Sequence, residues 1–249
     1  MIYDCILFSG LGSEDKILEI RIEELRPLKP IHVIVESYQT FTGKDKGLRL
    51  QKDRYNTNIR YITTASHFPD PWDNEQMQRN AIMHGLRNHD LHADDIIIIS
   101  DVDEIPRLDA IMNYSPSFGL ASIQMDEYFF WLNALYQRQT WNLPRIMPWS
   151  YAESRMPDQI RKEGFPMTVP NGGWHFSWAG GSANAMQKFQ SFSHQEPEIQ
   201  KWADLSKIQD CRLNTTHMFS GKPLEIMSID EMPRFVRDNQ EYFQELLYV

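Results

Sequence analysis

The segment from Asp95 to Pro106 constrains the fold more than any other part of the sequence. It contains four consecutive isoleucines, followed at once by Asp101, Asp103 and Glu104. So dense an apolar run predicts a strand buried on both faces, as in a parallel sheet covered by helices. Pro106 has no N–H to donate, so strand pairing is expected to stop there. We therefore expect an α/β protein whose buried strand ends in a cluster of acids.

These acids require compensating positive charge, because ionised carboxylates are costly to bury together. The carboxyl ends of strands in open α/β sheets face a ligand-binding crevice. Asp101 and Asp103 stand two positions apart, so in an extended backbone they point the same way, while Glu104 points elsewhere. Two hard oxygen ligands suit Mg²⁺ or Mn²⁺ shared with substrate phosphates. A surface turn with solvated acids is the alternative.

Strands and helices are expected to alternate in the first half of the chain. Predicted strands cover residues 2–8, 32–36, 60–64 and the run of isoleucines at 96–99, with helices at 14–26 (capped near Ser13) and 75–88 (capped by Asp73 or Asn74). This order predicts βαβ units, with helices on both faces of a mostly parallel central sheet. In the second half we expect a strand at 120–125, substrate loops at 142–173 and a closing helix at 232–247.

Composition limits the class of protein. A length of 249 residues suits one large domain, and a net charge of −9 argues against a nucleic-acid partner. No apolar run reaches the roughly 18 residues of a transmembrane segment. The first strand begins at residue 2, which leaves no room for a signal peptide. Cys5 lies in an apolar strand and is expected to be a reduced core thiol, so a cytoplasmic location is predicted.

A strand that ends in D-x-D after two βα units resembles the nucleotide-sugar glycosyltransferases of the GT-A (Rossmann-like) fold. A set of ordered motifs is similar, more closely, to glycosyltransferase family 17. The motifs are Tyr3–Phe8, Leu18–Leu25, Val35–Glu36, Thr40–Gly43, Arg79–Ile82, Ser100–Pro106 and Gly173–Trp178. The resemblance covers residues 2 to about 245. Since no shift in composition marks a linker, we expect one domain, 1–249. Its nucleotide-sugar half is about 1–106 and its acceptor half about 107–249.

The resemblance implies a metal-dependent, inverting transfer of a sugar from a UDP-sugar to a glycan or glycoconjugate. The implied donor is UDP-GlcNAc (UDP-N-acetylglucosamine), the metal is Mn²⁺ or Mg²⁺, and the product is β-linked. In such enzymes a later histidine often completes the metal site, and His175 is the candidate here, although it can equally be a core histidine.

Four further residues are candidates for contacts with the donor. Glu36 ends a predicted strand and can accept hydrogen bonds from ribose or uracil, or else form a salt bridge. Arg79 can reach the uracil or the diphosphate, or else pair with Glu75 four positions earlier. Asn80 is its weaker companion, and Val102 lies between the two aspartates.

The acceptor side needs a base and a surface for sugar rings. An inverting transfer requires a carboxylate that takes the proton of the acceptor hydroxyl. Glu127 is our first choice, ahead of Asp126, Glu153 and Glu196, each of which can also be a solvated loop acid. Trp131, Trp141, Trp174 and Trp178 can stack on sugars or pack in the core. Arg138, Arg145, Arg155 and Arg161, together with Lys188 and His194, are possible anion contacts but are expected to be mostly ordinary charges.

Three other functions fit parts of the pattern. A metal-dependent phosphohydrolase uses an aspartyl nucleophile, but its D-x-D usually follows the first strand. A non-catalytic carbohydrate-binding protein explains the aromatics but not the acids. A nucleotidyltransferase usually has a basic residue in an N-terminal glycine loop, and Ser9–Gly12 has none.

Overall fold

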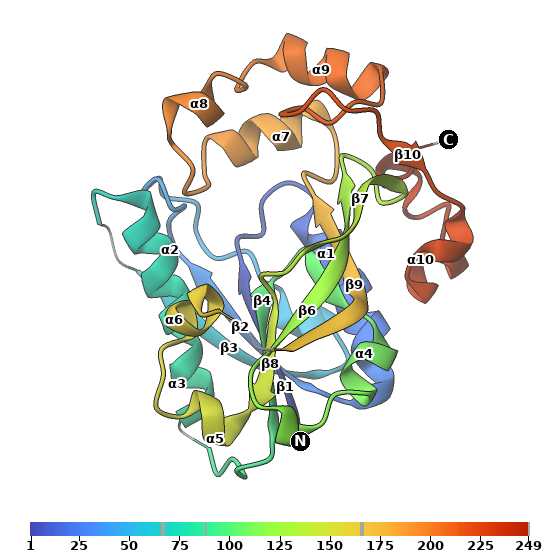
Figure 1. Cartoon of the computed structure of the whole chain (residues 1–249). Helices are drawn as coiled ribbons and strands as arrows, with labels where there is room; N and C mark the ends of the chain where they lie inside the picture. The colour runs from blue at the N-terminus through green and yellow to red at the C-terminus, as the bar shows by residue number, and fades with distance from the viewer. Residues whose placement is uncertain (66–67, 88, 165–166, 249) are drawn as a thin grey trace.

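Strands from both halves of the chain form one sheet at the centre of the computed structural model (Figure 1). The structure describes residues 1–65, 68–87, 89–164 and 167–248. The strands are β1 (Ile2–Phe8), β2 (Ile31–Ser37), β3 (Asn58–Thr64), β4 (Ile96–Asp101), β5 (Glu104–Pro106), β6 (Ala121–Phe129), β7 (Ala134–Trp141), β8 (Arg145–Pro148), β9 (Met167–Ser177) and β10 (Glu225–Ile226). Their order is β10-β7-β6-β8-β4-β1-β2-β3, with β9 paired to β5 and β6.

The parallel strands are concentrated in the first half of the chain. β1 pairs in parallel with β2 and β4, and β2 pairs in parallel with β3. Beyond β4 the sheet continues through antiparallel pairs of β8, β6 and β7, while β6 and β9 are parallel. The register places Leu7 beside Asp101 and Phe8 beside Glu36, so the ends of β1, β2 and β4 meet at one edge. The predicted α/β class is confirmed.

Helices cover both faces of the sheet, as predicted. They are α1 (Glu14–Leu25), α2 (Pro71–Asn80), α3 (Ile82–Arg87), α4 (Leu108–Met112), α5 (Trp149–Ala152), α6 (Pro157–Lys162), α7 (Ser182–Phe189), α8 (Pro197–Gln200), α9 (Leu205–Leu213) and α10 (Arg234–Asp238). Leu18 of α1 packs in one core cluster with Ile6, while Ile82 of α3 packs on the opposite face with Cys5. Cys5 is a buried free thiol, as expected.

The helix predicted for residues 75–88 has the wrong bounds. It begins at Pro71, because the side chain of Asp70 accepts a hydrogen bond from the Trp72 N–H at 2.9 Å and caps the first turn. It also breaks at Ala81, and α3 continues from Ile82. Residue 88 lies outside the described residues. α1, in contrast, begins at Glu14 as predicted and ends at Leu25, one residue early, although Ser13 makes no side-chain cap bond.

Two predictions for the second half are wrong. Residues 142–173 are not loops, because β8, α5, α6 and the start of β9 lie there. The closing helix predicted for 232–247 is also wrong, because these residues, all of which the structure describes, form the short helix α10 and a 3₁₀ turn at 244–246. Asn239 ends α10 by donating from its side chain to the Phe235 carbonyl at 2.9 Å. Val236, Phe243 and Leu246 are buried from separate turns.

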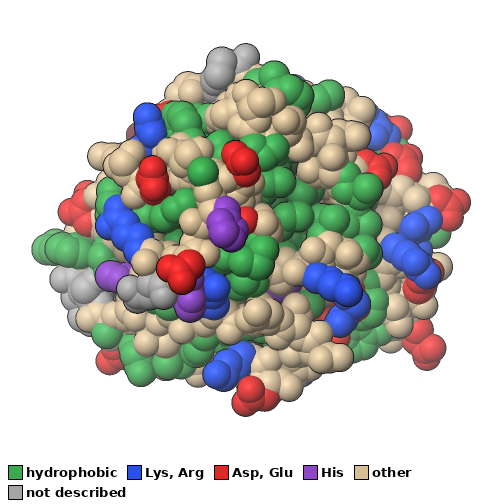
Figure 2. Space-filling view, turned by 90° about the horizontal axis from the view of Figure 1, so that it is seen from below, with side chains coloured by type: hydrophobic (Ala, Val, Ile, Leu, Met, Phe, Trp, Pro, Cys, Tyr) green, Lys and Arg blue, Asp and Glu red, His purple; other side chains and the backbone are tan. Residues whose placement is uncertain are grey.

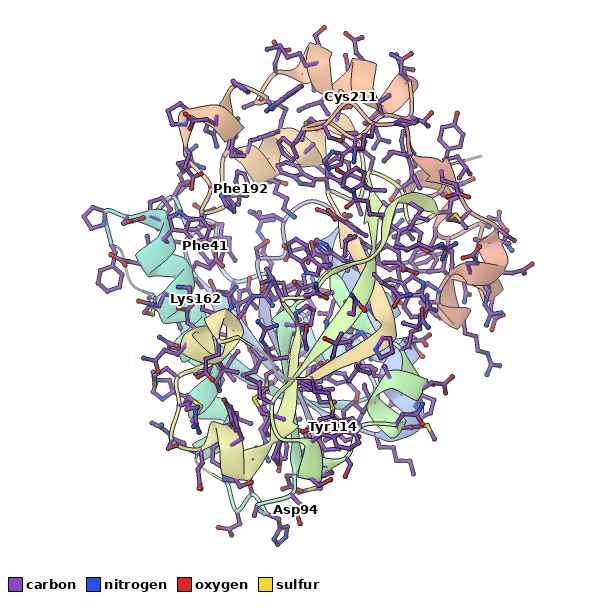
Figure 3. All side chains as sticks on the ribbon, viewed as in Figure 1. Phe41, Asp94, Tyr114, Lys162, Phe192 and Cys211 are labelled. Atoms are coloured by element: carbon purple, nitrogen blue, oxygen red, sulfur yellow. The ribbon has the colours of Figure 1, made fainter. Side chains whose placement is uncertain are left out.

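The segment from α7 to α9 lies over the carboxyl ends of the central strands (Figure 1). Figure 3 shows Phe192 and Phe41 near this end, with Asp94 and Tyr114 at the opposite one. Seen from that opposite end, acidic and basic side chains are interspersed with apolar surface (Figure 2). In the part of the chain that the structure describes, no helix has the length and apolar character needed to span a bilayer.

Gly85 allows α3 to approach β2 closely. A Cβ at this position would lie 2.4 Å from Cγ1 of Val33, whereas a Cβ at Gly164 would meet nothing within 4 Å. We expect Gly85→Ala to lower the free energy of unfolding by about 1–3 kcal/mol through overpacking. Urea denaturation measures the change, with Gly164→Ala as the matched control. Equal stability of the two variants would contradict this packing.

Candidate functional site

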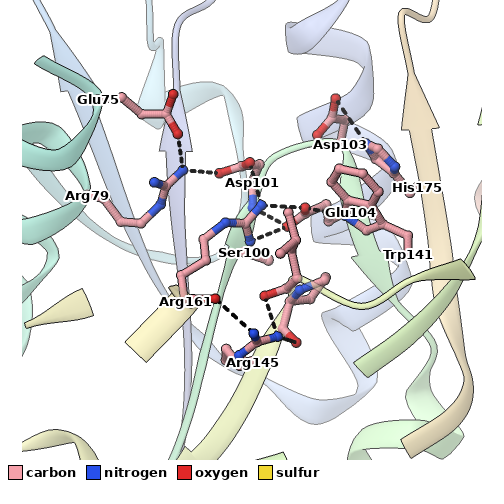
Figure 4. Close-up of polar contacts among 12 residues, drawn as sticks. Glu75, Arg79, Ser100, Asp101, Asp103, Glu104, Trp141, Arg145, Arg161 and His175 are labelled. Carbon is pink, nitrogen blue, oxygen red and sulfur yellow. Dashed lines mark hydrogen bonds and ion pairs between the residues drawn. The ribbon is translucent and has the colours of Figure 1, made fainter. Parts of the chain in front are cut away.

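The acidic segment forms a tight turn at the carboxyl end of β4 (Figure 4). β4 ends at Asp101, Val102 and Asp103 form the turn, and β5 begins at Glu104. The Asp101 N–H donates to the Glu104 carboxylate at 2.7 Å. Because the backbone does not stay extended, the prediction that Asp101 and Asp103 point the same way is wrong. Asp101 faces Arg79, whereas Asp103 faces the opposite side of the site.

Arg21 of α1 holds the backbone of this turn from inside the protein. Its guanidinium donates to the carbonyl oxygens of Asp101 at 3.0 Å and Glu104 at 2.6 Å. Its other N–H groups form a bidentate pair with Asp4 of β1 at 2.5 and 2.9 Å. Burial alone would raise the pKa of Asp4, but Arg21 and then His32 outweigh it and hold the pKa well below its usual range. A buried ion pair therefore fixes the turn.

Two further arginines bind the side chain of Asp101. Arg79 donates to Oδ1 at 3.0 Å and Arg161 to Oδ2 at 2.7 Å. Arg161 also makes two bonds to Glu104, at 2.6 and 2.9 Å. Burial opposes ionisation of Asp101, but Arg161 and Arg79 outweigh it and hold its pKa well below the usual range. Both oxygens of Asp101 are thus engaged by guanidinium groups rather than directed at a shared metal.

Asp103 has different surroundings. Its Oδ2 lies 3.4 Å from the Lys188 ammonium and 4.0 Å from Nε2 of His175. His175 is held by stacking on Trp141, with ring centroids 4.1 Å apart, and Trp141 in turn donates from Nε1 to Glu104 at 2.5 Å. Nδ1 of His175 is buried and has no hydrogen-bond partner among the described residues. Stacking, rather than a bond to Nδ1, therefore orients the ring toward Asp103.

The residues at the predicted metal site would hold an ion only together with substrate oxygens and water, because the described part of the chain does not provide a full set of ligands. Within the described ranges, no three His, Cys, Asp or Glu side chains lie close enough to hold a metal. Oδ2 of Asp103 and Nε2 of His175 face each other at 4.0 Å, and this carboxylate and imidazole would hold an ion together with other ligands. This donor set suits Mn²⁺, with the remaining positions left for substrate oxygens and water. Asp101 was also predicted as a metal ligand, but this geometry places its carboxylate against arginines and away from Asp103 and His175.

The two acids proposed as the base point to opposite faces of β6. They lie inside this strand, rather than after it as expected. Glu127 pairs in register with His175 on β9, so it lies on the face of the site. Burial raises the pKa of Glu127, and His175 partly opposes the shift. Asp126 instead accepts from the Gln139 N–H at 2.9 Å and lies 3.7 Å from Arg107.

The predicted donor-binding residues are largely engaged within the protein. Glu36 accepts four hydrogen bonds, from Lys46, Tyr61 and the backbone of residues 49 and 50, which fill the acceptor capacity of a carboxylate. Besides Asp101, Arg79 pairs with Glu75 at 2.7 Å and Asp158 at 3.2 Å. Asn80 accepts from the Asp158 N–H, and Val102 is a core residue. Glu36 and Arg79 thus show the salt bridges considered as their alternatives.

The predicted acceptor aromatics lie in three different places. Trp174 is buried, with Arg107 over its ring at 3.7 Å and its Nε1 bonded to the Glu231 carbonyl. It does not offer a face to a sugar, because its neighbour in sequence, His175, points to the site. Trp131 contacts Arg212 at 4.2 Å. Trp178 packs in a core cluster of aromatics, but it also lines the cavity beside Asp103.

Glu14 is a residue of the site that the sequence did not reveal. It lines a cavity of about 60 Å³ with Asp103, Trp178 and Lys188. Its carboxylate accepts from the N–H groups of Ser9 at 2.7 Å and residue 10 at 3.1 Å. Burial raises its pKa to about 7, and the Ser9 N–H offsets part of the rise. The available signal was an acid two residues after Gly12, next to the glycine-containing loop 9–12.

The remaining charged candidates are engaged as ordinary ion pairs or structural contacts. Arg145 donates to backbone carbonyls of residues 161 and 163, Arg138 pairs with Glu231, and Arg155 lies 3.8 Å from Glu163. Glu196 pairs with His194, and Glu153 is exposed at the end of α5. Arg161 is the exception, because it binds the acidic turn directly.

Comparison with known proteins identifies the family of this chain. The family model for glycosyltransferase family 17 matches residues 1–247. Curated relatives include the β-1,4-mannosyl-glycoprotein 4-β-N-acetylglucosaminyltransferases of Rattus norvegicus and Homo sapiens, each 23% identical over 96% of this chain. The chain spans about half of their length, 53% and 54%. A nucleoside-diphosphate-sugar pyrophosphorylase from Vibrio cholerae RC9 matches with a TM-score of 0.30 and 8% identity over 72% of this chain and 92% of its own, too weak to support an argument.

The fold and the family match together define an α/β glycosyltransferase. The chain belongs to glycosyltransferase family 17, because the family model covers nearly all of it. The predicted family is therefore confirmed.

Removal of Arg161 should destabilise the protein strongly. Arg161→Met leaves the carboxylates of Asp101 and Glu104 without this buried cation, so we expect a loss of about 3–5 kcal/mol of unfolding free energy at pH 7. Arg234→Met is the matched control, because Arg234 is 81% exposed and its ion pair with Asp238 lies at the surface. Urea denaturation compares the two. Equal losses of unfolding free energy in the two variants would contradict the role of Arg161 in binding the acidic turn.

The depressed pKa of Asp101 predicts a pH dependence of stability. The contribution of Asp101 is fully present above the pKa of an unfolded aspartate, about 4. It is lost as pH falls below 4 toward the folded pKa, because the unfolded chain binds the proton first. Asp101→Asn should therefore show a shallower fall in stability than the native chain between about pH 4 and pH 2. Denaturation across this range measures the slopes, and parallel slopes would contradict the prediction.

Proposed function

We propose that this chain transfers GlcNAc from UDP-GlcNAc to a glycan acceptor, with a divalent metal and with inversion at the anomeric carbon. The observation that carries the proposal is the pair formed by Asp103 and His175 at the end of β4, with Glu127 in register beside His175. The names of the curated relatives support GlcNAc as the transferred sugar. The glycan or glycoconjugate acceptor and the cytoplasmic location stay predictions.

Asp103 and His175 are the residues that would hold Mn²⁺ or Mg²⁺, together with oxygens of the donor diphosphate. When bound, the ion stabilises the negative charge that develops on the departing UDP. Asp101 has a supporting role in this proposal. It keeps Arg79 and Arg161 in place and so fixes the turn that presents Asp103.

Glu127 is proposed as the base. An acceptor hydroxyl oxygen forms the new bond to the anomeric carbon, and the bond to the diphosphate oxygen breaks, with its electron pair leaving on UDP. The carboxylate of Glu127 takes the hydroxyl proton. Its raised pKa makes it a stronger base than an ordinary glutamate, so it is better matched to neutral pH.

The phosphohydrolase interpretation has less support from the geometry. An aspartyl nucleophile needs a free carboxylate oxygen, but both oxygens of Asp101 accept bonds from arginines. A purely carbohydrate-binding role does not explain why the carboxylate of Asp103 faces the buried imidazole of His175. Neither alternative is favoured by a particular contact.

Metal-dependent binding of UDP is the first test. Calorimetry should show that native protein binds UDP with Mn²⁺ and loses at least tenfold in affinity, roughly 1.4 kcal/mol, when EDTA replaces the metal. Asp103→Asn should lose the same factor in the presence of Mn²⁺. UDP binding that is absent, or indifferent to metal and to Asp103, would sink the proposal.

Glu127→Gln tests the base. The substitution keeps the shape of the side chain but cannot accept the proton, so we expect the transfer rate to fall by about 10²–10⁴. Affinity for UDP with Mn²⁺ should stay within about threefold of native. Asp126→Asn is the matched control on the opposite face, and it should retain most of the rate. A control that loses as much rate as Glu127→Gln would contradict the assignment.

A further inference from the structure

Lys188 holds the side of Asp103 that faces the cavity. Its ammonium lies 3.4 Å from Oδ2 of Asp103, the same oxygen that faces Nε2 of His175. The Lys188 side chain is 38% exposed and lies over the ring of Trp178 at 5.3 Å. Among the described residues that line this cavity, Lys188 is the one cation. Asp103 is therefore neutralised by a side chain that reaches solvent.

The segment that carries Lys188 is fixed against two neighbouring loops. Gln187 accepts from the Gly12 N–H at 3.0 Å, which ties the end of α7 to the loop after β1. The carbonyls of Gln190 and Ser191 accept from the side chain of Thr42 at 2.8 Å and the N–H of Phe41 at 3.0 Å. With the backbone held in this way, a change at Lys188 is confined to its long side chain.

A divalent ion and the Lys188 ammonium would compete for the same carboxylate oxygen. Both need Oδ2 of Asp103, and their like charges repel at this distance. The cavity of about 60 Å³ has room for a few water molecules, whereas pockets for small ligands are typically about 300–1,000 Å³. A diphosphate oxygen that reaches Asp103 or an ion bound to it must therefore enter the space that the Lys188 ammonium borders.

We propose that Lys188 is a built-in counter-ion that leaves Asp103 when a divalent ion binds and then binds the diphosphate of the donor. The inference rests on the proposed function and adds a residue and a sequence of contacts to it. Arg79 and Arg161 are poor substitutes for this role, because their guanidinium groups are bound by the acids of the turn and of α2. Lys188 alone combines reach into the cavity with a side chain partly in solvent.

Opposite effects on two affinities test this exchange. The affinity for Mn²⁺ alone is measured by electron paramagnetic resonance of the free ion, and the affinity for UDP at saturating Mn²⁺ by calorimetry. Lys188→Met removes the competing charge, so we expect Mn²⁺ alone to bind at least tenfold more tightly. The same variant lacks the phosphate contact, so UDP should bind at least tenfold more weakly.

Two controls make the test specific. Lys188→Arg keeps the charge and should stay within about threefold of native in both measurements. Lys29→Met removes one charge directly before β2, at the end of the strands opposite to the site. It should also change neither affinity. Thermal unfolding checks that each variant is folded.

The outcomes separate this inference from the proposed function. If native protein binds UDP with Mn²⁺ but Lys188→Met leaves either affinity unchanged, the exchange is overturned and the proposed function stands. If Lys188→Met weakens Mn²⁺ binding, Lys188 supports the ion rather than competing with it, and the exchange is again overturned. Failure of the native protein to bind UDP with Mn²⁺ overturns the proposed function itself.

Discussion

The acidic turn after β4 depends on three buried arginines. Arg21 fixes its backbone through two carbonyl oxygens, while Arg79 and Arg161 bind its side chains. Each arginine comes from a different helix, α1, α2 or α6, so helices on both faces of the sheet converge on the turn. Breaking a buried pair of this kind costs several kcal/mol, and the geometry of the site is therefore coupled to the stability of the fold.

Because these arginines bind Asp101 and not Asp103, the two aspartates have different roles. Asp101 is the structural member, since each of its carboxylate oxygens accepts a hydrogen bond from a guanidinium group. Asp103 remains on the cavity side, where the partly exposed ammonium of Lys188 and the stacked ring of His175 face one of its oxygens. The buried arginines thus hold one side of the site in place, and the exchange of cations that we propose is confined to the other side.

The sequence predicted the parallel half of the sheet and the place of the site, because a run of isoleucines followed by acids is a local signal. It did not predict that buried arginines would bind this turn. Arg161 lies sixty residues from Asp101 and pairs with it only through the tertiary fold. Arg21 carried a signal that went unused, since it shares the apolar face of its helix with Leu18 and Leu25. The turn at Val102 depended on buried partners that no local pattern encodes.

The most direct test is the position of the metal in crystals grown with Mn²⁺ and UDP. Anomalous scattering at the manganese edge locates the ion without assumptions about its ligands. The account predicts a peak about 2.1 Å from both Oδ2 of Asp103 and Nε2 of His175, with Asp101 still bound to Arg79 and Arg161. A peak on Asp101, with its arginines displaced, would contradict it.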